Sequence, residues 1–159
     1  MEITQLFSSM PFAELLGIEV TRAEDGMAEA RLQMTRKLSS NTARNVGHGG
    51  VAFALADTVA GAAVVSLTGE PAPTVDMRID YLKPATDDMT ARAEVVRRGN
   101  TSAVVDVTVR HEGEGDADAE DGYGSAQGDE IARARGVFKL GVEEGSEHDR
   151  DTDEIGNSP

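Results

Sequence analysis

One apolar segment, Gly50 to Leu67, constrains the fold more than any other part of this sequence. It is too long for a single strand and its flanks are rich in glycine, so the pattern predicts a helix. Apolar residues cover nearly all sides of this helix, which is typical of a helix buried on most sides. Its many alanine and glycine residues would allow a sheet to curl closely around it. Asp57 is its one charged residue, and this charge argues against a membrane span.

The remaining patterns predict an α+β fold in which an antiparallel sheet packs on this helix. The predicted elements are a short helix and a turn at 1–16, interrupted at Pro11, a hairpin at 18–35, and strands at 75–82, 91–98, 103–109 and 131–140. Because no helix separates the later strands, the pattern disfavours a parallel doubly wound sheet. Long alternating strands with short links favour antiparallel pairing.

The net charge of −14 is distributed unevenly and indicates the domain boundaries. Residues 111–130 hold eight acidic and no basic residues, and residues 141–159 hold seven acidic and one basic. Both stretches have few large apolar residues, so burial cannot offset their ordering entropy and we expect them to be disordered or loosely ordered. The sequence predicts one domain over 1–140, with an acidic insertion at about 111–130, and an acidic tail over 141–159.

Composition disfavours several classes of function. The chain has no cysteine, which excludes disulfides, zinc–thiolate sites and a cysteine nucleophile. Its three histidines lack metal-ligand spacing, so we expect no metal centre. No basic stripe could neutralise phosphates, so we expect no nucleic-acid partner. The first ten residues show no signal-peptide pattern, and we expect a cytoplasmic protein that does not bind membranes.

The acidic residues also suggest an environment. Three lysines stand against twelve arginines, and 29 residues are acidic. This bias suits a halophilic protein, because carboxylates hold water and ions in a high-salt cytoplasm. The alternative is that the acidic segments recruit a basic partner.

Asp57 and the glycines before the helix are the candidate site. A buried carboxylate is costly unless it is paired, and the helical neighbours of Asp57 cannot pair with it. It is therefore either a structural residue bonded to a distant group or a residue that faces a pocket. The segment Asn45 to Gly50 places glycines at the helix N-terminus, where free N–H groups can bind phosphate or a developing oxyanion. Such N–H donors with a carboxylate two turns away can hold a carbonyl and activate a water.

These motifs resemble those of hotdog-fold acyl-CoA thioesterases of the phenylacetate-degradation type. The matching residues are His48-Gly49-Gly50, Phe53, Leu55-Ala56-Asp57-Thr58 and the strand from Thr74 to Ala85. The resemblance spans about 11–140, apart from the insertion. It implies an antiparallel sheet wrapped around one long central helix, in homodimers or homotetramers with active sites between subunits. It also implies hydrolysis of acyl-CoA to free acid and CoA, for which no metal or redox cofactor is required.

The resemblance also implies roles for individual residues. Asp57 would be the general base or the nucleophile, and the backbone N–H of Gly49 would polarise the thioester carbonyl. Asn45 would hold the water or the substrate, and Thr74 stands where some members place a hydroxyl beside the site. The residues expected to meet CoA are Pro84, Arg97, Gly99 and Asn100.

The asparagine departs from the family pattern, in which it commonly precedes the histidine by six residues. Asn45 precedes His48 by three, so Asn41, or no asparagine, is the alternative. We expect His48 mainly to orient the loop by hydrogen bonding.

Two functions other than thioester hydrolysis are also compatible with the sequence. A non-catalytic acyl-CoA binding or regulatory protein could use the same fold, and an assembly module could act through the acidic tail. The carboxylate of Asp57 within an apolar helix favours the enzyme. Aryl or medium-chain acyl groups are the expected substrates.

Overall fold

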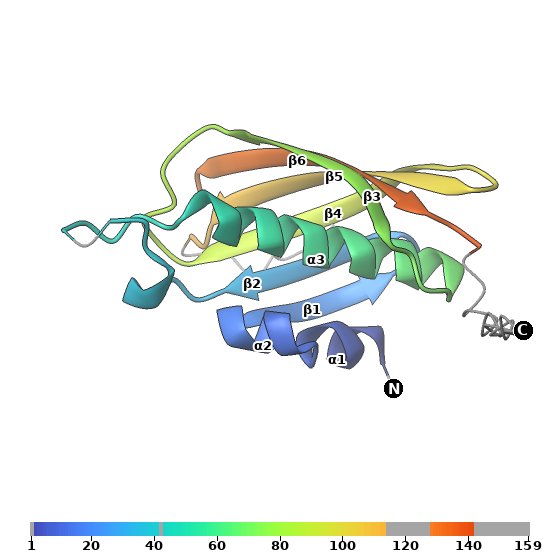
Figure 1. Ribbon diagram of the computed structural model, residues 1–159, viewed down its shortest axis with the longest axis horizontal. Coiled ribbons are helices and arrows are strands. Elements are labelled where there is room, and N and C mark those ends of the chain that lie inside the picture. The colour runs from blue at the N-terminus through green and yellow to red at the C-terminus, as the bar shows by residue number, and fades with distance from the viewer. Residues whose placement is uncertain (1, 42, 114–127, 142–159) are drawn as a thin grey trace, which may run out of the picture.

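The computed structural model describes residues 2–41, 43–113 and 128–141 (Figure 1). The elements are α1 (Ile3–Ser8), α2 (Pro11–Leu16), β1 (Ile18–Glu24), β2 (Met27–Leu32), the 3-10 helix η1 (Arg36–Leu38), α3 (Gly49–Thr68), β3 (Thr74–Tyr81), β4 (Met89–Arg98), β5 (Ser102–His111) and β6 (Glu130–Lys139). The six strands form one antiparallel sheet in the order β1-β2-β4-β5-β6-β3. Figure 1 shows α3 lying lengthwise across this sheet, and α3 contacts every strand. The predicted α+β architecture, with one long central helix, is confirmed.

Helix α3 begins and ends one residue beyond the predicted segment. His48 caps its N-terminus, and Gly69 ends it in the left-handed conformation with φ 73°. By length and composition α3 could cross a membrane, but 67% of its most apolar window is buried inside the domain. It is therefore the core helix of a folded domain.

Small side chains dominate the core between α3 and the sheet. On β5 every second residue from 103 to 109 is buried against the core, and these residues are Ala103, Val105, Val107 and Val109. Large side chains that are fully buried are few, and the five largest are Phe138, Leu32, Leu55, Met89 and Ile131. The alanines of α3 allow the close approach of helix and sheet that the sequence predicted.

The N-terminal segment differs from the predicted helix and turn. Two six-residue helices, α1 and α2, lie beside β1, and Pro11 is the first residue of the second helix. Proline has no N–H to donate and its φ suits a first helical turn, so Pro11 starts α2. Gly17 ends α2 in the left-handed conformation at φ 74°.

Strand β3 forms one edge of the sheet in this chain, because it pairs with β6 alone. Large apolar side chains are exposed on and just after it: Val75 is 65% exposed, Tyr81 54% and Leu82 53%. A long edge strand with exposed apolar side chains is a template for pairing with another chain.

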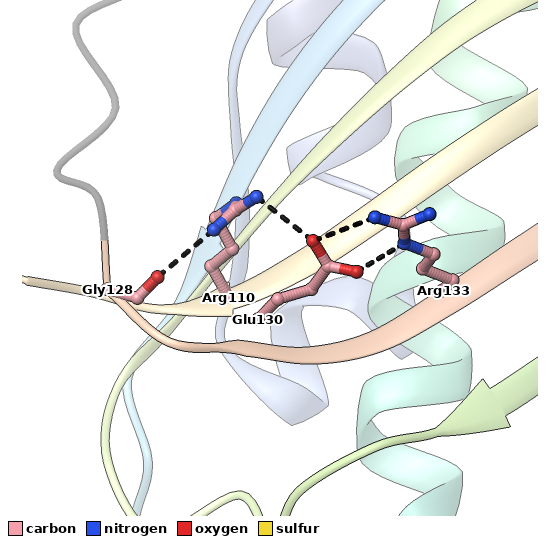
Figure 2. Close-up of polar contacts among 4 residues, drawn as sticks. All are labelled: Arg110, Gly128, Glu130 and Arg133. Carbon is pink, nitrogen blue, oxygen red and sulfur yellow. Dashed lines mark hydrogen bonds and ion pairs between the residues drawn. The ribbon is translucent and has the colours of Figure 1, made fainter.

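Ion pairs join charged residues at the end of β5 and the start of β6, the two strands that flank the acidic insertion. Glu130, whose side chain is 18% exposed, forms ion pairs with Arg110 and Arg133 (Figure 2). Arg110 also donates from Nη1 to the Gly128 carbonyl at 3.3 Å. The predicted disorder of the insertion and of the tail concerns mainly 114–127 and 142–159, which lie outside the described residues.

Glu130 predicts a pH dependence of stability. The hydrogen bond from Arg133 lowers the pKa of Glu130. Ionised Glu130 therefore stabilises the fold above its unfolded pKa of about 4.3, and this stabilisation is lost as the pH falls through the lower folded pKa. We expect Glu130→Gln to lower the urea midpoint at pH 7 and to approach the wild type below about pH 4. The exposed Glu14→Gln serves as control, and an equal deficit at both pH values would show that the contribution is not electrostatic.

Candidate active site

The partner of Asp57 comes from the start of β3. Thr74 Oγ1 donates a hydrogen bond of 2.7 Å to Asp57 Oδ1. Asp57 is half-buried, in the middle of α3. Among the described residues, no donor bonds to the second carboxylate oxygen, Oδ2. Asp57 thus has the distant hydroxyl partner that one interpretation required, and it retains an oxygen that could accept a proton.

The first turn of α3 presents one free backbone donor. His48 Nδ1 accepts from the Gly50 N–H at 2.9 Å, and the His48 carbonyl accepts from Val51 N–H at 2.9 Å. Within the described part of the chain, no acceptor meets the Gly49 N–H. The cap agrees with the expected role of His48, and it leaves Gly49 as the amide able to bind a ligand oxygen.

Tyr81, at the end of β3, lies against the same turn. Its hydroxyl donates to the Gly49 carbonyl at 2.8 Å. A Cβ on Gly49 would lie 3.1 Å from both Cζ and Oη of Tyr81, so a side chain there would push the Tyr81 ring away by a few tenths of an ångström. Partial burial raises the pKa of Tyr81, which keeps the hydroxyl protonated as a donor. The sequence placed Tyr81 on a strand but contained no signal for this contact, because the two residues lie 32 positions apart.

A cavity of about 380 Å³ opens at this end of α3. Its lining includes His48, Gly49, Ala52, Tyr81, Pro84 and Ile131. The structure therefore brings Pro84, a predicted CoA contact, beside Gly49.

The other predicted CoA contacts lie elsewhere in the chain. Arg97 is in β4, and Gly99 and Asn100 belong to the turn between β4 and β5. Gly99 and Asn100 line a second hollow of about 710 Å³ with Thr68. Thr68 is the last residue of α3, so within one chain these residues lie at the opposite end of the helix from Pro84.

The two candidate asparagines precede α3 in an exposed loop. The Asn41 side-chain oxygen accepts from the N–H groups of Ala43 and Arg44, at 2.8 and 3.2 Å, so it organises the loop. Asn45 is exposed, three residues before His48. Its side chain is accessible to a ligand.

The Gly49 N–H and the Asp57 carboxylate, which are expected to act on one carbonyl, lie far apart within one chain. Gly49 and Asp57 are eight residues apart on α3, which corresponds to about 12 Å along the axis. A reacting carbonyl has to lie about 3 Å from both the oxyanion donor and the attacking group. One chain therefore does not bring both groups to the same carbonyl.

Over residues 2–41, 43–113 and 128–141, no group of three or more His, Asp or Glu side chains is placed to hold a metal ion.

Comparisons with known proteins agree on one family. A family model described as the thioesterase superfamily matches residues 45–117. A candidate esterase of Halobacterium salinarum is 35% identical over 130 residues, which cover 79% of this chain and 81% of that protein. The medium/long-chain acyl-CoA thioesterase YigI of Escherichia coli is 31% identical over 119 residues, covering 65% of this chain and 77% of that protein.

Solved structures show the same fold. The PaaI protein of the Escherichia coli phenylacetic acid degradation operon superposes with a TM-score of 0.68 and 26% identity, covering 85% of this chain and 87% of that one. A hypothetical thioesterase of Streptococcus pneumoniae, solved with coenzyme A, superposes with a TM-score of 0.61 and 25% identity, covering 77% and 84%. From the hotdog architecture and these relatives we conclude that the chain belongs to the thioesterase superfamily and is a thioester hydrolase.

Proposed function

We propose that this protein hydrolyses an aryl- or medium-chain acyl-CoA to the free acid and CoA in the cytoplasm, and that Asp57 is the catalytic carboxylate. The observation that carries the proposal is the Asp57 carboxylate, which accepts from Thr74 at Oδ1, meets no donor at Oδ2 among the described residues, and is the one charged group of a largely apolar helix. Relatives support the substrate class, since YigI is named as a medium/long-chain acyl-CoA thioesterase and the Streptococcus pneumoniae structure contains coenzyme A.

Two chemical routes are open to Asp57. As a general base it takes a proton from water, whose oxygen attacks the thioester carbonyl. As a nucleophile its own oxygen attacks, and water then hydrolyses the resulting anhydride. In both routes the carbon–sulfur bond breaks and CoA leaves as a thiolate. The Gly49 N–H would donate to the oxygen that becomes negative.

A second copy of the chain would complete the site. Because Gly49 and Asp57 lie about 12 Å apart along α3, we propose that Gly49 of one protomer serves Asp57 of its partner. The exposed apolar edge at β3 starts with Thr74, which bonds Asp57, and ends with Tyr81, which bonds Gly49. Pairing of two such edges in a homodimer, or in a homotetramer built from it, would bring the two groups together.

The same arrangement would unite the proposed CoA contacts. Pro84 lies at one end of α3, whereas Gly99 and Asn100 lie at the other. CoA would then contact Pro84 of one protomer and the turn between β4 and β5, with Arg97 beside it, of the other. Asn45 would reach the bound water or substrate from its exposed loop.

The substrate class can be tested directly by following CoA release with a thiol-reactive dye. Phenylacetyl-, benzoyl-, short-chain and medium-chain acyl-CoAs would be compared in molar KCl, which suits the acidic composition. We expect the highest kcat/KM with an aryl or medium-chain substrate. Binding of intact acyl-CoA without CoA release would contradict the catalytic proposal.

Thr74 provides a finer test of how Asp57 is held. Thr74→Val keeps the shape and removes the hydroxyl that donates to Asp57 Oδ1. We expect kcat to fall about tenfold, because one hydrogen bond to a charged group contributes about 1.5–3 kcal/mol, part of which the carboxylate recovers by moving. Thr74→Ser keeps the hydroxyl and should retain most activity. Equal losses in the two variants would indicate a packing effect instead.

A further inference from the structure

Tyr81 and His48 bind the two polar groups of one peptide unit. The Tyr81 hydroxyl donates to the carbonyl of Gly49 at 2.8 Å, and the N–H of Gly50 donates to His48 Nδ1 at 2.9 Å. That carbonyl and that N–H belong to the single peptide between Gly49 and Gly50. Hydrogen bonds joined through one peptide polarise each other, so each strengthens the other.

The packing around this peptide is close on both sides, and glycine at each position leaves room for the neighbouring ring. A Cβ on Gly49 would meet the Tyr81 ring at 3.1 Å, and a Cβ on Gly50 would meet His48 Nδ1 at 3.0 Å. Both distances are shorter than ordinary van der Waals contact, so a side chain at either position would require the neighbouring ring to move by a few tenths of an ångström. All of these residues except Gly50 line the 380 Å³ cavity.

The hydrogen bonds also determine where the imidazole proton of His48 resides. A nitrogen that accepts a hydrogen bond carries no proton, so the neutral ring holds its proton on Nε2. The cap occupies the Gly50 N–H, whereas the Gly49 N–H meets no acceptor in the described part of the chain. Tyr81 therefore acts on the oxyanion donor through the peptide that follows it.

We propose that Tyr81 is a positioning residue for the thioester hydrolysis described above: its hydroxyl holds the peptide between Gly49 and Gly50, and through it keeps His48 as the cap and the Gly49 N–H free for the thioester oxygen. This inference rests on the proposed function. Nothing in the sequence pattern distinguished Tyr81 from its neighbours on β3.

Tyr81→Phe is the decisive variant, because it keeps the ring against Gly49 and removes only the hydroxyl. We expect kcat to fall about tenfold while KM stays within about twofold, because an oxyanion donor stabilises the transition state more than bound substrate. Thr21→Val is the matched control. It removes a hydroxyl that donates to the backbone carbonyl of Glu29 on β2, and it should leave kcat and KM unchanged.

A second measurement follows His48 itself and does not depend on activity. Long-range ¹H–¹⁵N spectra distinguish the two imidazole tautomers, and His48→Asn identifies the His48 signals among the three histidines. We expect one tautomer, protonated at Nε2, in the wild type, and a shift toward a mixture in Tyr81→Phe.

The outcomes separate the inference from the proposed function. An unchanged kcat together with an unchanged His48 tautomer in Tyr81→Phe overturns the inference, and so does a rise in KM alone, which would mean that Tyr81 contacts the substrate. If the wild type hydrolyses no acyl-CoA, the proposed function fails, and the tautomer measurement alone decides on the positioning role.

Discussion

Asp57→Asn is expected to lower kcat for acyl-CoA hydrolysis at least about a hundredfold, the scale of a lost general base. Asparagine keeps the size and shape of the side chain but cannot take a proton from water or attack a carbonyl. Its amide oxygen can still accept from Thr74, so the local structure should persist. The measurement is the rate of CoA release at saturating substrate, with circular dichroism to establish that the variant is folded.

The control for this result is the same substitution at a site without a proposed role. Asp25 lies in the turn between β1 and β2 at φ 49°, which asparagine also tolerates, so Asp25→Asn should keep full activity. Wild-type activity in folded Asp57→Asn would exclude Asp57 as the catalytic carboxylate.

Mixed dimers extend the same experiment to the shared site. Asp57→Asn removes the carboxylate, and Gly49→Val places a branched side chain against Tyr81 beside the oxyanion donor, so we expect each variant alone to lose activity. A mixed dimer would contain one site with both residues intact. Recovery of activity on mixing is expected if Gly49 and Asp57 of a site come from different protomers. No recovery in a dimer shown to be mixed would mean that the proposed sharing is wrong.

Phe138→Ala is expected to cost about 3–5 kcal/mol of unfolding free energy, and we expect a value in the upper part of that range. Phe138 is 1% exposed and is the largest fully buried side chain of the described core. Its ring lies near Gly61 of α3 and Gly136 of β6, and its strand neighbour on β5 is Ala103. Neighbours without large side chains cannot move into the space, so most of the cavity should remain. Urea unfolding monitored by circular dichroism measures the loss.

Phe12→Ala is the matched control for the loss of a phenyl ring. Phe12 lies on α2 and is 60% exposed, so we expect a change within about 0.5 kcal/mol. A similar loss in both variants would show that burial does not explain the effect at Phe138.

Local patterns were sufficient for most of the fold. The apolar segment predicted α3 to within one residue at each end, because a helix with no polar side has to be buried and its flanking glycines end the pattern. The alternation in 103–109 predicted the buried face of β5. The N-terminal region was predicted less well, because Pro11 can either break a helix or begin one.

The candidate site was predictable only in part. A lone carboxylate in an apolar helix is conspicuous in any sequence, and glycines before a helix indicate free amides, so Asp57 and the segment from Asn45 to Gly50 were candidates from the residues themselves. The role of the Gly49 N–H came from the family resemblance. Thr74 came from the family resemblance, and Tyr81 was not identified. Both hydroxyls reach α3 from β3, across 17 and 32 positions of chain, and no local pattern encodes which residues of a strand will meet a helix.

By itself the sequence determined the class of fold, the central helix, the carboxylate within that helix and the glycine turn before it, because each depends on local composition and periodicity. The tertiary structure decided that Thr74 holds Asp57, that Tyr81 packs on Gly49, and that the proposed CoA contacts lie at opposite ends of α3. These facts depend on the order of strands in the sheet, which places β3 at the edge beside β6 rather than beside β4, its successor in the chain. Which strands pair depends on how all six strands pack against α3, and not on any single segment of the sequence.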